Sequence, residues 1–148
     1  MIKFKTKKLD VKKGIKQLNE KMSGMRDVDA FYLFGSFANG RQTPLSDLDL
    51  AYLPRANLNR SQAAQLDKEL YLMLAKLFET DDITLVNLND APPALAFNVI
   101  KNNPIFCKNN SNLSAYKESV ISVYPEIKRM NELFSSIYLK RLHKKYEN

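Results

Sequence analysis

The chain has few cysteine and histidine residues, which are common in metal clusters, in disulfides and as catalytic bases. Among its 148 residues there is one cysteine, one histidine and no tryptophan. With Cys107 as the only cysteine, the chain can form neither an internal disulfide nor a metal–thiolate cluster, and we expect this residue on a buried strand. The single histidine, His143, lies among lysines and an arginine near the C-terminus, which argues against histidine-based catalysis.

Long apolar runs are missing as well. No stretch approaches the roughly 20 residues that a membrane-spanning helix needs, and the lysine-rich start lacks the apolar core of a signal peptide. Hydrophobic residues make up 45% and charged residues 26% of the chain, as is ordinary for a soluble globular protein. We therefore expect a single domain over residues 1–148, with a substantial core and a cytoplasmic location.

The net charge of +7 lies at the two ends of the chain. Residues 1–21 carry +6 and residues 126–148 carry +3, so the middle carries −2. Lysines near the start, such as Lys3 and Lys5, could attract nucleic-acid phosphates without sequence preference, but aromatic residues that would stack on bases are scarce there. We expect a solvated tail or an arm that faces an acidic partner, with nucleic-acid binding as the weaker alternative.

The most informative stretch joins a Gly-Ser pair to two aspartates. Gly35-Ser36 follows the apolar run 31–34, a predicted strand. Ten residues separate Ser36 from Asp47, which lies with Asp49 in a second predicted strand. Side chains two apart on a strand share a face, so the two carboxylates should lie close together and repel each other. A hard cation such as Mg²⁺ would relieve this repulsion and take further ligands from water and substrate phosphates.

The Gly-Ser pair supplies the other half of a phosphate site. Gly35 lets a phosphate approach the backbone closely, and the start of the following helix offers N–H groups. The hydroxyl of Ser36 adds one more donor. An isolated Asp-x-Asp is most often a solvated strand edge, so it is the combination that predicts a cradle for a metal-bound nucleoside triphosphate.

Hydrophobic periodicity and turn residues predict the remaining elements. Ser61 is the expected N-cap of the long central helix, and Pro125 should kink or restart the terminal one. The expected helices cover residues 10–22, 36–39, 60–78, about 92–101 and 113–146. The expected strands cover residues 30–34, 47–53, 82–88 and 105–108.

The minimal nucleotidyltransferases (MNT) share a pattern in which a Gly-Ser pair is followed, after ten residues, by Asp-x-Asp. The chain resembles this family, which is part of the polymerase β-like nucleotidyltransferase superfamily. The resemblance continues through the turn 37–40 and the segment 85–95. It covers residues 28–108, the expected nucleotidyltransferase core. It implies an α+β fold, in which a small mixed sheet is flanked by helices and a C-terminal helical extension follows over residues 113–146.

The resemblance also implies an activity and a partner. Proteins of this type are antitoxins that transfer AMP from ATP to a hydroxyl, typically of a tyrosine, on a HEPN ribonuclease toxin. Applied to this chain, the resemblance implies that Gly35 and Ser36 bind the β- and γ-phosphates of ATP. Asp47 and Asp49 would coordinate Mg²⁺.

One part of the family pattern is missing. A third carboxylate normally helps to hold a second metal and activates the attacking hydroxyl, and its aligned position here is Thr84, a neutral residue and a poor base. Asp82 lies two residues earlier, on the same face of a regular strand but about 6–7 Å away, and a bulge could bring it closer. The site should therefore bind nucleotide, while its catalytic power depends on Asp82 or Thr84.

Two other classes of function stay open. A non-catalytic binding module could mask its partner by direct contact, which the neutral Thr84 favours. A small-molecule transferase would generally need a further domain to form its cleft, for which 148 residues leave little room.

The terminal segment carries a helical apolar stripe. Its members recur at intervals of four, three, four and three residues, and they are Val123, Ile127, Met130, Phe134 and Ile137. The sequence leaves two interpretations open, since such a stripe can pack on the domain or form a surface for a partner helix, including a second copy of the chain.

Overall fold

The computed structural model describes residues 10–43 and 45–146 of the protein. The lysine-rich start, with Lys3 and Lys5, lies outside the described residues. The elements in chain order are α1 (Val11–Met22), β1 (Val28–Phe34), α2 (Gly35–Ala38), β2 (Leu48–Pro54), α3 (Arg60–Leu77), β3 (Ile83–Asn87), α4 (Pro93–Ile100), β4 (Phe106–Cys107) and α5 (Asn110–Tyr146).

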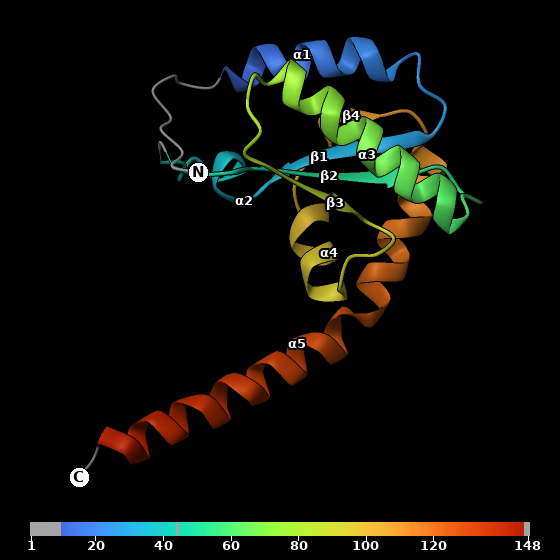
Figure 1. Ribbon diagram of the computed structural model, residues 1–148. Coiled ribbons are helices and arrows are strands. Elements are labelled where there is room, and N and C mark those ends of the chain that lie inside the picture. The colour runs from blue at the N-terminus through green and yellow to red at the C-terminus, as the bar shows by residue number, and fades with distance from the viewer. Residues whose placement is uncertain (1–9, 44, 147–148) are drawn as a thin grey trace.

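The four strands form one mixed sheet in the order β3-β2-β1-β4 (Figure 1). β1 pairs antiparallel with β2 and with β4, whereas β2 and β3 run parallel. The connection from β2 to β3 contains α3, because two parallel strands need a long crossover between them. This architecture confirms the predicted α+β fold with a small mixed sheet.

Helices cover both faces of the sheet and divide the core into two clusters. On one face, residues of α1 and α3 such as Leu18 and Leu70 pack against Leu50 of β2. On the other face, α4 and the first turns of α5 pack against Ala51 and its neighbours. Since side chains alternate along a strand, Asp49 points to the same face as Ala51, the face that α4 and α5 cover.

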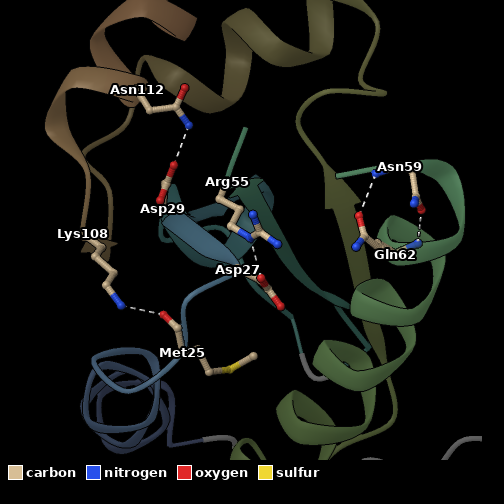
Figure 2. Close-up of polar contacts among 8 residues, drawn as sticks. All are labelled: Met25, Asp27, Asp29, Arg55, Asn59, Gln62, Lys108 and Asn112. Carbon is tan, nitrogen blue, oxygen red and sulfur yellow. Dashed lines mark hydrogen bonds and ion pairs between the residues drawn. The ribbon is translucent and has the colours of Figure 1, made fainter. Parts of the chain in front are cut away.

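Polar contacts fix the end of the sheet at which β1 begins (Figure 2). Asp29 is only 6% exposed, and its carboxylate accepts a hydrogen bond from the side-chain amide of Asn112 at 2.6 Å. Nearby, Nε of Arg55 donates to the carboxylate of Asp27, also at 2.6 Å. The contact of Asp29 with Asn112 ties the start of α5 to β1.

One predicted helix cap is wrong. The N-cap of α3 is Asn59 rather than Ser61, because the side chain of Asn59 accepts the backbone N–H of Gln62 at 2.8 Å. In return, the side chain of Gln62 accepts the backbone N–H of Asn59 at 3.0 Å (Figure 2). This reciprocal pair satisfies two backbone donors at the start of the helix.

α5 is one helix of 37 residues with Pro125 inside it. Its first turns are packed, since Leu113 and Val120 are buried and the hydroxyl of Tyr116 donates to the carbonyl of Leu88 at 2.8 Å. Beyond Val120 the helix leaves the body of the protein (Figure 1), and every described side chain there is exposed. In the described part of the chain, no helix is long and apolar enough to cross a membrane.

Candidate active site

Gly35 joins the end of β1 to the candidate site. It begins α2 with a φ of +71°, a left-handed conformation that residues with a side chain rarely adopt. β1 pairs with β2 so that Phe34 lies opposite Asp49, and a Cβ atom at Gly35 would collide with the carboxylate of Asp49. The left-handed backbone angle favours glycine at this position, and an added Cβ would force the carboxylate of Asp49 to move.

Asp49 and Asp47 come together at the start of β2. Asp49 is half-buried within the strand, and Asp47 is exposed just before it. Burial raises the pKa of Asp49 above its ordinary value, the negative charge of Asp47 raises it further, and a hydrogen bond with Thr84 lowers it. The structure thus brings the two carboxylates close enough to repel each other, next to the Gly-Ser turn.

Thr84 lies directly beside Asp49. The two residues are partners in the parallel pairing of β2 with β3, and their side chains are joined by a hydrogen bond. The register of this pairing runs without a shift from Leu48 to Tyr52, so the paired residues contain no bulge of the kind that would move Asp82 forward. Thr84, not Asp82, occupies the position next to Asp49.

Asp82 lies one residue before β3 and is only 5% exposed. Its carbonyl accepts the backbone N–H of Leu48 at 2.9 Å, and its own N–H donates to the hydroxyl of Thr80 at 3.1 Å. These contacts hold Asp82 at the start of the parallel pair. Asp82 is less exposed than Asp49.

The Gly-Ser turn and the loop after it form the rim of the site. Ser36 is half-buried in the single turn of α2, and its carbonyl accepts the backbone N–H of Arg41 at 2.9 Å. Further along, the backbone N–H of Thr43 donates to the hydroxyl of Ser46 at 2.8 Å. These local bonds lie between the Gly-Ser end of the motif and its acidic end.

The acidic pair suits a metal ion that is shared with a substrate. Within residues 10–43 and 45–146, no group of three or more His, Cys, Asp or Glu side chains could hold a metal ion by itself. Mg²⁺ commonly binds through one or two carboxylates together with waters and substrate phosphates. Asp47 and Asp49 fit that mode, and they would hold the ion jointly with a nucleotide.

A groove of about 460 Å³ lies at the opposite end of β2, away from the Gly-Ser turn. It contains none of the six predicted site residues, and the sequence gives no motif that would reveal it. One of its acidic residues, Asp67, accepts a hydrogen bond from the hydroxyl of Tyr52 at 2.9 Å. The groove is lined by Pro54, Arg55, Asn57, Leu58, Asn59, Arg60, Ala63, Ala64, Asp67, Asn87, Asn89 and Asp90.

Comparison with solved structures shows the same fold in toxin–antitoxin complexes. A chain from a toxin–antitoxin complex with AMP-PNP is 21% identical, with a TM-score of 0.62, and the match covers 85% of this chain and 98% of that one. A chain from a mutant MntA–HpeT toxin–antitoxin complex is 24% identical, with a TM-score of 0.63 and coverages of 89% and 99%.

A third similar structure is that of a tri-AMPylated Shewanella oneidensis HEPN toxin in complex with an MNT antitoxin. Its matching chain is 21% identical, with a TM-score of 0.58, and the match covers 84% of this chain and 98% of that one. At such identities the likeness establishes the fold. No curated protein sequence matches the chain.

The family model described as Polymerase beta, Nucleotidyltransferase matches residues 16–112, which is more than half of the chain. The matched region contains all four strands of the sheet, the Gly-Ser turn and both aspartates of the motif. This match confirms the family predicted from the motif. The protein belongs to the polymerase β nucleotidyltransferase family, and it has the fold seen in the MNT–HEPN toxin–antitoxin structures.

Proposed function

We propose that the protein binds Mg-ATP and transfers AMP to a hydroxyl, that of a tyrosine, on a HEPN-type toxin, and thereby neutralises the toxin. The observation that carries this proposal is the approach of Gly35 to Asp49, beside Asp47, where a left-handed backbone turn meets a pair of carboxylates. The solved complexes with AMP-PNP and with a tri-AMPylated HEPN toxin support the choice of nucleotide and acceptor.

Each site residue has a proposed role. Gly35 forms the left-handed turn that lets the carboxylate of Asp49 approach the backbone, and the hydroxyl of Ser36 would donate a hydrogen bond to a phosphate. Asp47 and Asp49 would hold Mg²⁺. When bound, the ion would neutralise negative charge on the departing pyrophosphate.

The transfer step has a defined balance of bonds. The oxygen of the acceptor hydroxyl forms a bond to the α-phosphorus of ATP, the bond from that phosphorus to the bridging oxygen breaks, and pyrophosphate leaves. The proton of the hydroxyl must pass to a base. Thr84 is neutral and cannot accept it efficiently, so we expect water to take the proton and the transfer to be slow.

The neutral residue beside Asp49 also favours a second candidate function. Without an acid at that position, the protein could bind its partner and mask it by contact alone. The exposed distal half of α5 would offer surface for such a contact. The two candidates share the fold and differ in whether AMP is transferred.

Substitutions at Thr84 and Asp82 separate the two candidates. A well-placed acid–base group is typically worth about 10²–10⁴-fold in rate. We therefore expect Thr84→Asp to raise the rate of AMP transfer by about tenfold or more, with little change in nucleotide affinity. Asp82→Asn is the matched variant, and it should leave the transfer rate close to that of the natural protein.

The measurement uses the full chain, ATP, Mg²⁺ and a purified HEPN-type partner, with the AMP adduct followed by intact-protein mass spectrometry. If Asp82→Asn abolishes transfer instead, Asp82 rather than water is the base. If the partner gains no AMP with the natural protein or with either variant, although a stable complex forms, contact masking is the better explanation.

A further inference from the structure

The distal half of α5 carries a coherent apolar surface. We call Val123, Met130, Leu133, Phe134 and Ile137 the distal stripe; their side chains are between 40% and 63% exposed. At 3.6 residues per turn these five positions fall within an arc of about 100° on the helix. The side chain of Ile127, which the sequence pattern adds to this face, lies outside the described side chains.

No part of the described chain covers this stripe. α5 leaves the body after Val120 and points away from it (Figure 1). The stripe also lies beyond residues 16–112, the region that matches the nucleotidyltransferase family. Exposed apolar residues that occur singly need no explanation, but a contiguous row of them indicates an interaction surface.

The distribution of charge along α5 indicates which kind of partner fits the distal stripe. The segment 138–146 contains Lys140, Arg141, Lys144 and Lys145 and no acidic residue. The segment 126–132 contains two acidic and two basic residues, so its charges cancel. A parallel pair of α5 helices would place two basic segments together. An antiparallel pair centred on Met130 would place each basic segment against residues 114–122, whose one acidic and one basic residue cancel. Neither arrangement of two copies is electrostatically complementary.

We propose that the distal stripe docks into an apolar groove on a different protein, and that acidic residues border this groove where it meets residues 140–145. The apolar groove would bury the stripe in the manner of an amphipathic helix in a groove, and the acidic border would fix its direction. The partner is therefore an acidic, helix-binding protein and not a second copy of the chain.

The docked protein is also positioned to be the acceptor of AMP, an extension that rests on the proposed function. α5 starts beside β1 at the end of the sheet marked by Asp29 and Asn112. In Figure 1 it then runs toward the side of the view on which α2 lies. Asp49 points to the face of the sheet that α4 and α5 cover, so a protein held along α5 would lie on that same face.

Two synthetic helical hairpin peptides, each with an apolar groove between its two helices, test the docking surface directly. Both carry leucine at the same heptad positions, and they differ in having glutamate or lysine at the flanking positions. We expect the full chain to bind the glutamate peptide about tenfold or more tightly than the lysine peptide in fluorescence anisotropy, and more weakly as salt is added. The double variant Phe134→Ser/Ile137→Ser should lose about tenfold in affinity for the glutamate peptide.

The helix offers a matched control for that variant. Ile121 and Leu139 are exposed by 54% and 62%, and they lie about 180° around the helix from Met130 at the centre of the stripe. Ile121→Ser/Leu139→Ser removes a similar amount of exposed apolar surface from the other side. We expect it to change the affinity for the glutamate peptide by less than about twofold.

Several results would overturn this proposal. Equal affinity for the two peptides would do so, as would equal damage from the stripe variant and the control variant. A dimer in light scattering that the stripe variant dissociates would identify a second copy as the occupant. Binding to phosphatidylglycerol-containing vesicles that depends on the stripe would identify a membrane surface. Calorimetry with Mg-ATP separates the two proposals, because loss of peptide binding leaves the nucleotide site intact, whereas failure to bind Mg-ATP leaves the docking surface intact.

Discussion

The two ends of β2 differ in whether their charged side chains have partners within the chain. At the end of the strand, Asp67 accepts a hydrogen bond from Tyr52, and the nearby Arg55 is paired with Asp27. At the start, burial and the charge of Asp47 both raise the pKa of Asp49. At the end of β2 the charged side chains have partners within the chain, so we call it the compensated end. At the start of β2, the negative charges of Asp47 and Asp49 accumulate. The compensated end serves the fold, and the accumulated negative charge is what a bound cation would compensate.

Among the variants that test this comparison, the glycine substitutions should change the free energy of unfolding most. Gly35→Ala forces an unfavourable φ and also drives a Cβ atom into the carboxylate of Asp49, so we expect a loss of about 2–4 kcal/mol in the free energy of unfolding. Gly40→Ala is the matched control, because Gly40 has a φ of +69° but nothing within 4 Å of an added Cβ. It should cost about 1–2 kcal/mol. Urea denaturation measures both, and equal losses would mean that the approach to Asp49 is not tight.

The compensated end should tolerate the loss of a partner less well than the charged end. Asn112→Ala removes a hydrogen bond from the buried carboxylate of Asp29, and we expect it to lower the free energy of unfolding by about 2 kcal/mol. Asp47→Asn removes one of two repelling charges, and we expect the stability to stay unchanged or to rise. Denaturant titration of both variants at the same pH and salt checks this. If Asp47→Asn lowers the free energy of unfolding more than Asn112→Ala does, the proposed difference between the two ends is wrong.

The start of α3 should show the smallest effect. Asn59→Ala removes the side chain that accepts the N–H of Gln62, and such a cap is typically worth about 1 kcal/mol. Ser61→Ala should change the free energy of unfolding by less than about 0.5 kcal/mol, because the cap is Asn59. Thermal denaturation of the two variants distinguishes them, and an equal loss from both would show that the cap is shared.

The sequence was sufficient where a single element decides the geometry. The alternation of apolar and acidic residues correctly places Asp49 on the opposite face from Leu48 and Leu50, whereas Asp47, predicted in the same strand, lies just before β2. The cap of α3 could also have been predicted, because Gln62 stands three residues after Asn59, as a capping box requires, whereas Ala64 stands three after Ser61.

Contacts between elements were beyond the reach of the sequence pattern. The approach of Gly35 to Asp49 depends on the register of β1 against β2, and the place of Thr84 depends on the parallel register of β2 with β3. Periodicity within one strand does not set either register. For the same reason the sequence left Asp82 and Thr84 as alternatives, although only Thr84 lies beside Asp49.

Calorimetric titration of Mg-ATP into the full chain and into the double variant Asp47→Asn/Asp49→Asn is the most direct test of the acidic pair as a nucleotide–metal site. The natural protein should bind Mg-ATP, and the double variant should lose most of the magnesium-dependent affinity, about tenfold or more, because the charge that attracts the ion is gone. Its circular dichroism spectrum and unfolding midpoint should match those of the natural protein, which would show that the fold is intact. Equal affinities for Mg-ATP in the two proteins would contradict a site at Asp47 and Asp49.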